Sequence, residues 1–207
     1  GSEMCIRDRD NDTLVITNGG SVILTGSDAI HAKNHSGVTI DNKGTISAST
    51  NQAINMQHAV NSTVTSSGTI EATLRNAILI DGADADNITI NNSGTLKAGK
   101  KQVILATNSE NTTIINSGTI ETTNSSNPNT SGINYYNTSG AAIDGAIITN
   151  SGTIFAFGTG IRFGTLGNAS KAVNNMTITN LGTIEGGTAS IAVHNANATG
   201  TNIITKG

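Results

Sequence analysis

The sequence predicts an all-β protein, a right-handed single-stranded parallel β-helix of about seven to eight coils with three short strands per coil. Three observations predict it: a phrase that recurs at a nearly fixed interval, an alternation of apolar and polar residues within the phrase, and a third apolar segment after most copies. The phrase is an apolar residue, a polar residue, Asn, any residue, Gly, Thr and Ile, as in residues 40–46 and 148–154. Such a period marks a solenoid, in which each repeat stacks on the last.

The glycines of the phrase set the coil length. They are Gly20, Gly44, Gly68, Gly94, Gly118, Gly152, Gly182 and Gly207. Subtracting neighbouring numbers gives steps of 24, 24, 26, 24, 34, 30 and 25. An interval near 24 favours a right-handed helix with three faces.

The alternation identifies the strands and their inward side chains. Four residues before the glycines stand Ile16, Ile40, Val64, Ile90, Ile114, Ile148, Ile178 and Ile203. Two residues after them come Val22, Ile46, Ile70, Leu96, Ile120, Ile154 and Ile184. A period of two predicts short strands on both sides of the glycine. A third strand is predicted around Ile30, Ile54, Ile78, Ile104, Ile161 and Ile191.

An Asn stands two residues before most of these glycines. The column is Asn18, Asn42, Asn92, Asn116, Asn150 and Asn180, with Ser66 and Thr205 as departures. Asn repeated at one bend can bond the copies above and below it, so we predict a structural Asn ladder. The neighbouring Gly is expected to supply the positive φ of a sharp corner.

The chain divides into a short leader and one solenoid. Residues 1–9 hold Met4, Cys5, Arg7 and Arg9 in a chain otherwise poor in these types, and we interpret them as a non-native or disordered leader. Residues 10–207 are predicted to form the β-helix, with longer irregular coils at about 124–174. Both ends look cut within a repeat, so a fragment of a longer protein with open, self-associating ends is expected.

Composition narrows the classes of partner. Charged residues are 12% of the chain and the net charge is −3, so the basic field that nucleic-acid binding needs is not expected. No apolar run reaches the length of a membrane-spanning helix, and no signal peptide opens the chain. Residues 10–207 lack Cys, which suits passage through an oxidising periplasm. No cofactor is predicted.

The repeats resemble the passenger domains of bacterial autotransporters, which are surface-exposed β-helical proteins of type V secretion. The resemblance is carried by residues 149–154 (Thr-Asn-Ser-Gly-Thr-Ile), 116–120 (Asn-Ser-Gly-Thr-Ile) and 92–96 (Asn-Ser-Gly-Thr-Leu), and it spans about residues 13–207. It implies a cell-surface or extracellular location and a non-catalytic adhesive or presenting role toward a glycan or a host or matrix surface. Filamentous adhesins and phage tail proteins use comparable coils.

One region is a candidate binding site. All five aromatic residues lie between positions 135 and 163: Tyr135, Tyr136, Phe155, Phe157 and Phe163. Extra loops are implied near 124–131, 136–145 and 164–174. By parity Phe155, Phe157 and Arg162 face outward and Phe163 joins the core. We therefore predict ligand contact through Tyr135, Tyr136, Phe155, Phe157 and Arg162. The alternative is that Phe155 and Phe157 pack beneath the loops and the solenoid is a pure stalk.

Other chemistry is less well supported. A carbohydrate-cleaving site needs clustered carboxylates, and only Asp144 lies near the aromatic loops. Glu71, Lys97 and Glu121 predict a ladder of charges on a solvated face.

The sequence also gives little support for metal binding or ice binding. Asp81, Asp84 and Asp86 share a loop of hard oxygen ligands for Ca²⁺, but their spacing occurs once. The histidines lack metal-ligand spacing and read as surface residues; they are His31, His35, His58 and His194. The Thr stripe at Thr39, Thr63, Thr89, Thr113 and Thr177 is too irregular at its neighbouring column to favour ice binding.

Overall fold

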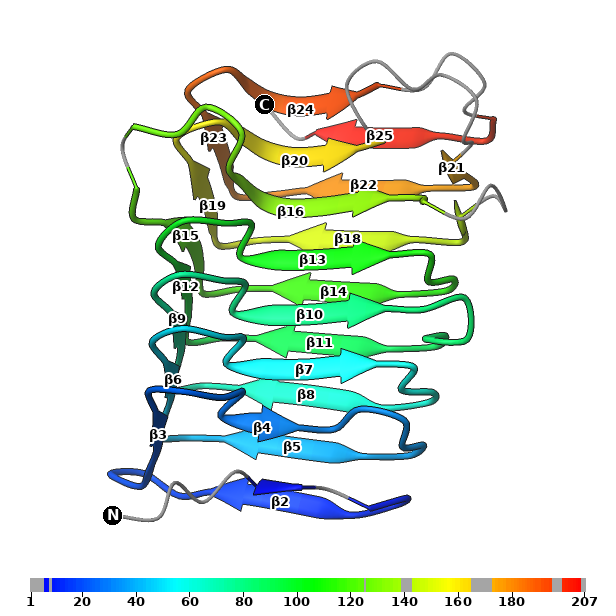
Figure 1. Ribbon diagram of the computed structural model, residues 1–207. Helices are drawn as coiled ribbons and strands as arrows, with labels where there is room; N and C mark the ends of the chain where they lie inside the picture. The colour runs from blue at the N-terminus through cyan, green and yellow to red at the C-terminus, as the bar shows by residue number, and fades with distance from the viewer. Residues whose placement is uncertain are drawn as a thin grey trace.

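Each repeat supplies three short strands, and these stack into the three parallel sheets of a solenoid (Figure 1). The computed structural model describes residues 6–7, 9–124, 126–138, 143–164, 173–194 and 199–205. Seven successive triplets of strands, from β2–β4 to β22–β24, make seven coils. The predicted fold class is confirmed.

Sheet A has eight strands: β1 (Ile6–Arg7), β4 (Ile30–His31), β7 (Ile54–Gln57), β10 (Ile78–Asp81), β13 (Ile104–Thr107), β16 (Ser131–Tyr136), β20 (Thr159–Phe163) and β24 (Ala189–Val193). Sheet B also has eight: β2 (Thr13–Ile16), β5 (Thr39–Asn42), β8 (Thr63–Ser66), β11 (Thr89–Asn92), β14 (Thr113–Asn116), β18 (Ile147–Asn150), β22 (Thr177–Asn180) and β25 (Asn202–Thr205). Sheet C has seven: β3 (Ser21–Leu24), β6 (Thr45–Ala48), β9 (Thr69–Ala72), β12 (Thr95–Ala98), β15 (Thr119–Thr122), β19 (Thr153–Ala156) and β23 (Thr183–Gly186). A separate pair joins β17 (Ile143–Asp144) to β21 (Val173–Asn174).

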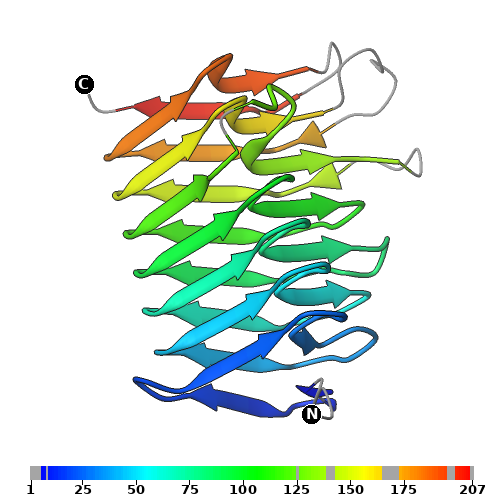
Figure 2. The ribbon, with the colours of Figure 1, turned by 60° about the vertical axis from the view of Figure 1, so that its left-hand side comes forward.

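Within a coil the chain passes from sheet B to sheet C and then to sheet A. In Figure 2 the strands of sheet C cross the near side from lower left to upper right while the chain climbs from its N-terminal end. This path is a right-handed helix, as predicted, and it agrees with the strong preference of parallel crossovers for that hand.

The core is a column of aligned apolar side chains, one set from each sheet. Ile114 pairs with Ile90 and Ile148 in sheet B, and Leu96 pairs in the same way within sheet C. The inward residues of the middle coils are fully buried. Burying each Ile or Leu is worth about 1.5–3 kcal/mol, so repetition along the axis supplies the stability that a thin column lacks in cross-section.

The excluded leader takes part in the fold at one point. Ile6 and Arg7 form β1 and pair in parallel with Ile30 and His31 of the first coil. These two residues of the predicted leader therefore continue sheet A with their backbone. Residues 1–5 and residue 8 lie outside the described residues.

The glycines of the phrase are required for close approach. None of Gly44, Gly68 or Gly118 has a positive φ, so the positive φ expected for them is wrong. A Cβ on Gly118 would lie 2.1 Å from the carbonyl oxygen of Gly94 in the coil below, and Gly44 and Gly68 show the same contact. Only hydrogen fits between stacked backbones at this corner.

The described residues hold no helix that is long and apolar enough to cross a membrane.

Candidate functional site

The Asn column forms a hydrogen-bonded ladder in the corner between sheets B and C. The Nδ2 of Asn116 donates to Asn150 Oδ1 at 2.7 Å, and Asn92 Nδ2 donates to Asn116 Oδ1 at 2.8 Å. Asn150 continues the ladder to Asn180 at 2.7 Å. These side chains are buried or nearly so and also bond backbone carbonyls, as Asn116 does with Thr153 at 3.2 Å. The predicted ladder of Asn–Asn hydrogen bonds is present from Asn92 to Asn180.

The ladder has two irregularities. Asn42 donates to Ser66 Oγ at 3.1 Å, but Ser66 Oγ bonds the carbonyl of Gly68 and not the side chain of Asn92. Asn92 Oδ1 therefore has no partner among the described residues. Asn18 is exposed and lies outside the ladder, because the residue aligned with Asn42 is Ile16. The inclusion of Asn18 was wrong, since two additional residues in the turn from β2 to β3 shift the first coil.

A second column of turn residues was missed. It stands two residues before the first residue of the sheet B strands and holds only Asn or Gly in left-handed conformation: Asn11, Gly37, Asn61, Asn87, Asn111, Gly145, Asn175 and Gly200. The φ values of its Asn residues lie between 50° and 60°. Asn and Gly are the residues that tolerate this conformation. The interchange of Asn and Gly before each strand was the sequence signal.

The candidate aromatic site is divided between the core and the surface. Tyr135 on β16 and Phe163 on β20 stack inside the solenoid with ring centroids 5.3 Å apart. Tyr135 is 0% exposed, and burial raises the pKa of its hydroxyl. Ligand contact predicted for Tyr135 is therefore wrong: its parity on β16 points it inward, while the placement of Phe163 in the core is confirmed.

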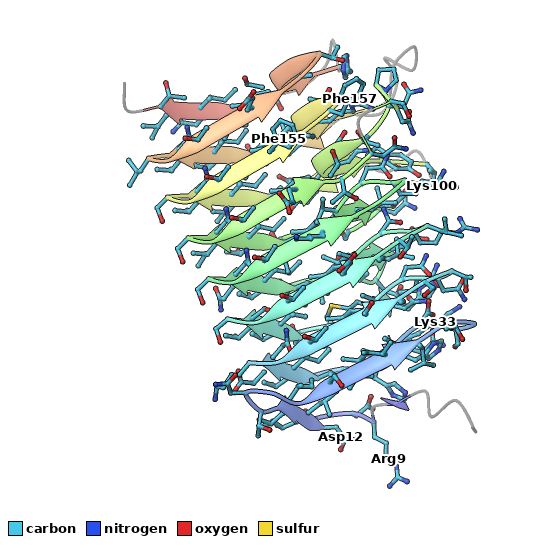
Figure 3. The ribbon with its side chains drawn as sticks, turned by 90° about the vertical axis from the view of Figure 1, so that its left-hand side faces the viewer. Arg9, Asp12, Lys33, Lys100, Phe155 and Phe157 are labelled. Carbon is cyan, nitrogen blue, oxygen red and sulfur yellow. The ribbon has the colours of Figure 1, made fainter. Side chains whose placement is uncertain are left out.

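The other three aromatic residues lie nearer the surface. Phe155, on the outer face of β19, is 36% exposed, and Phe157 follows the same strand and is half-buried. Both lie on the sheet C side of the solenoid (Figure 3). Tyr136 is half-buried at the end of β16 in sheet A, so the structure does not bring it to Phe155 and Phe157. Outward orientation of Phe155 and Phe157 is confirmed.

Arg162 is covered. It is 8% exposed on β20, and burial lowers the pKa of its guanidinium. Nη2 donates to Thr159 Oγ1 at 3.1 Å, and Nη1 lies 3.5 Å from the carbonyl oxygen of Asn129. The segment around Asn129 belongs to the enlarged fifth coil and lies over the outer face of sheet A. Arg162 was predicted to face outward and contact a ligand, but little of its side chain is accessible, and it bonds Thr159 and the Asn129 carbonyl instead. Residues 139–142 and 165–172 of the predicted loops lie outside the described residues.

The charge ladder of sheet C is confirmed. Glu71, Lys97 and Glu121 occupy aligned positions, and Lys97 Nζ lies 3.0 Å from Glu121 Oε1. The hydrogen bond to Glu121 raises the pKa of Lys97. Phe155 takes the next place in this column, between Glu121 and Glu185.

The carboxylates of the proposed Ca²⁺ loop bond different partners. Asp81 accepts from Gln57 at 3.1 Å, and Asp86 accepts from the backbone N–H of Glu110 at 2.8 Å. Asp84 lies 2.5 Å from His58 Nδ1. Within the described ranges no three His, Cys, Asp or Glu side chains converge as a metal site.

Two further histidines also lie beside carboxylates. His31 is 3.4 Å from Asp28, and His35 is 3.4 Å from Asp10. The Thr stripe runs in register from Thr39 to Thr113, and Ile147 then interrupts it.

The aromatic pair at β19 supplies apolar contact area on a strand held by the ladder and the core. No family model, curated protein or solved structure matches this chain, so its function has to be argued from the residues and geometry described above.

Proposed function

We propose that this solenoid is a non-catalytic, surface-exposed segment of a secreted bacterial protein, of the autotransporter passenger kind, that binds a ligand beside its irregular coils. The observation that carries the proposal is Phe155. In its column, the two coils below hold the charged residues Lys97 and Glu121, and the coil above holds Glu185. A Phe that is 36% exposed in such a column costs solubility without adding to the core.

The aromatic pair suits a glycan or a matrix protein. A rigid ring offers a flat apolar face with little entropy to lose, which favours contact with the C–H face of a sugar or with an apolar side chain. Phe157 adjoins Phe155 along the chain, and its backbone N–H is fixed by a 3.0 Å bond to Thr122 Oγ1. Both rings are therefore held by a scaffold that does not have to order on binding.

The test is binding of the purified chain to immobilised glycans and matrix proteins. Phe155→Ala/Phe157→Ala should lose binding, whereas Ile23→Ala should keep it. Ile23 is the matched control because it is 64% exposed and lies on the outer face of sheet C in β3, far from β19. Circular dichroism checks that all three proteins are folded.

Equal binding by the double variant and the wild type would show that the binding site does not include Phe155 and Phe157. Absence of binding by every folded protein would favour the pure stalk. The proposed location outside the cell is tested separately, by protease digestion of intact bacteria that make the protein naturally.

Self-association is a second candidate because apolar residues are exposed on the last strand. Ile203 and Ile204 of β25 are 43% and 49% exposed. A second copy stacking on this coil would cover the edge of the sheet. Sedimentation at increasing concentration tests it: Ile203→Lys/Ile204→Lys should stay monomeric where the wild type assembles, and a wild type that stays monomeric would exclude it.

A further inference from the structure

The corner that joins sheet C to sheet A carries positive charge without compensation. We call it the C–A corner and define it as residues 73–77, 99–103, 123–124, 126–130, 157–158 and 187–188, the described connections in the third to seventh coils. In these five coils it holds Arg75, Lys100 and Lys101 and no Asp or Glu, a charge of +3 in a chain whose net charge is −3; the same connection of the first coil, residues 25–29, holds Asp28.

Two of these cations are stacked on each other. Ala72 is aligned with Ala98 and Ile78 with Ile104, and five residues connect each pair, so Arg75 and Lys101 occupy the same position in successive coils. Equivalent positions of neighbouring coils are about 4.8 Å apart. Like charges opposed across neighbouring strands are destabilising, so this arrangement gains nothing for the fold.

The cations of the corner lack acidic partners. Arg75, Lys100 and Lys101 are exposed, and the ion pairs of the described residues include none of them. Lys43 and Lys97, in contrast, bond Asp41 at 2.9 Å and Glu121 at 3.0 Å. Arg9 and Lys33 also take part in none of these ion pairs, but the C–A corner holds three such cations within two successive coils.

Arg162 adds a fourth positive charge beneath the corner. It is only 8% exposed, and its Nε has no hydrogen-bond partner in the described part of the chain. Outside that part, residue 125 and residues 139–142, 165–172, 195–198 and 206–207 contain no Asp or Glu, and the acidic residues there are Glu3 and Asp8 near the start of the chain. A buried guanidinium without a carboxylate is costly, and an external anion would compensate it.

The residues of the corner are linked to one another. Asn127 Nδ2 donates to the carbonyl of Lys100 at 3.4 Å, and Gln102 Nε2 donates to the carbonyl of Asn129 at 3.4 Å. The same Asn129 carbonyl lies 3.5 Å from Arg162. The segment 126–130 therefore lies between the exposed lysines and the buried arginine. Phe157 and Lys100 both lie toward the right-hand edge of Figure 3.

We propose that the C–A corner binds an acidic polysaccharide, whose carboxylate or sulfate groups lie along Arg75, Lys100 and Lys101. The inference rests on the proposed function and names the ligand chemistry of its site. A chain with a charge on every sugar or every second sugar suits cations repeated along the solenoid axis. Phe157, at the C-terminal end of the corner, could stack against the face of a sugar ring. Phe155 lies between Glu121 and Glu185 and is less suited to an anionic ligand.

A polysaccharide is favoured over nucleic acid and over an anionic membrane. Duplex binding draws on many phosphate contacts, and three cations on a chain of net charge −3 supply few. A membrane surface would need a broad basic face, whereas these cations follow one narrow corner.

The test measures binding of the whole chain to hyaluronan, which carries only carboxylates, to heparin, which adds sulfates, and to neutral dextran. Lys100→Gln/Lys101→Gln should weaken binding to the acidic polymers about three- to tenfold, the effect expected for two exposed ionic contacts. Lys33→Gln/Lys43→Gln removes the same charge elsewhere and should leave the affinity within about twofold. Added salt should weaken wild-type binding more steeply than that of the corner variant.

The outcomes separate this inference from the proposed function. Equal effects of the two lysine variants, or no binding to either acidic polymer, would overturn the acidic ligand. Stronger lysine-dependent binding to an oligonucleotide or to phosphatidylserine vesicles would overturn the polysaccharide. If neutral ligands bind through Phe155 and Phe157 and the corner variant binds them normally, the proposed function stands and the inference fails.

Discussion

The side chain that most directly fixes the stacking of coils is the ladder Asn. Asn116 has no exposed surface, donates to Asn150 and accepts from Asn92. Asn116 and Asn150 use both ends of the amide, because the oxygen receives a bond from the coil below while the nitrogen donates to the coil above. Removing the Asn116 side chain deprives the buried Asn150 Oδ1 of this donor, whereas Asn92 Nδ2 keeps its bonds to the carbonyls of Gly94 and Thr119.

Asn116→Ala should lower the free energy of unfolding by about 1–3 kcal/mol, the cost of unpaired buried polar groups. Asn18→Ala is the matched control, since Asn18 is exposed and outside the ladder. It should change stability by less than about 0.5 kcal/mol. Urea denaturation followed by circular dichroism measures both, and equal effects would mean that the ladder contributes no more than an exposed turn residue.

The pair of His58 and Asp84 bears on titration at the surface. The hydrogen bond to His58 lowers the pKa of Asp84 from its ordinary 3.8. A carboxyl whose folded pKa is lowered stabilises the fold above its unfolded pKa, and that contribution is lost as the pH falls through the folded value. Both groups are largely exposed, so the effect on stability is small.

His58→Asn should raise the pKa of Asp84 back toward 3.8, as measured by NMR titration of the carboxyl carbon. Asn suits this site because His58 has a φ of 56°, and Asn34 of the first coil and Asn108 of the fourth adopt a similar conformation at the same place in the repeat. An unchanged Asp84 titration in the variant would show that His58 is not the cause.

The hydrogen bonds along a column of strand residues are interrupted wherever one member cannot bond both of its neighbours. In the Asn column, Ser66 interrupts the transfer of hydrogen bonds, and Asn92 Oδ1 is left unpaired among the described residues. An Asn in this place would reach both neighbours, because β8 aligns Ser66 with Asn42 and Asn92.

Ser66→Asn should stabilise the protein by about 1 kcal/mol, the typical net worth of a hydrogen bond together with the paired oxygen. The measurement is the urea midpoint at unchanged slope. A lower midpoint would indicate that the corner is too narrow at β8 for the larger side chain.

The core of the fifth and sixth coils contains the stacked rings of Tyr135 and Phe163. The Tyr135 hydroxyl is buried without a partner in the described ranges. Tyr135→Phe should therefore be neutral or slightly stabilising, whereas Tyr135→Ala should cost about 3–5 kcal/mol through the cavity it leaves. Thermal unfolding distinguishes the two, and a marked loss in Tyr135→Phe would reveal a bond to the hydroxyl.

For the whole molecule, the contribution of a residue depends on how many coils cover it. Ile114 and Ile203 stand at the same place in the repeat, yet Ile114 is 0% exposed and Ile203 is 43% exposed. In a solenoid each coil contacts only its neighbours, so a middle residue packs on two coils and an end residue on one.

Ile114→Ala should cost about 2–5 kcal/mol, and Ile203→Ala well under half of that, since its side chain leaves less apolar surface in contact. Equilibrium unfolding of both variants tests it. Equal losses would show that the last coil is covered in solution, as end-to-end association predicts.

The regular part of the fold was predictable residue by residue. Ile40, Ile46 and Ile54 were identified as inward from the alternation, and all three are fully buried. Chain order and repeat length also set the partner of each strand, because a coil of fixed length brings equivalent residues into register. In the first coil this reasoning predicted the wrong register. Ile16 precedes Gly20 by four residues and was expected to align with Ile40, but it aligns with Asn42.

The candidate site was predicted in its region but not in its parts. Phe155 and Arg162 have the same outward parity, yet one is exposed and the other is covered by the segment that includes Asn129. Parity gives the direction of a side chain relative to its own strand and says nothing of what lies above it.

The sequence by itself determined the solenoid, its hand, its three sides and its Asn ladder, because each follows from a local pattern repeated once per coil. Only the tertiary structure decided that Tyr135 and Arg162 are covered, that Phe155 is exposed, and that Arg75, Lys100 and Lys101 share a corner free of acids. These outcomes depend on how inserted residues fold over a finished face and on which coils are neighbours in space, and no single repeat contains that information.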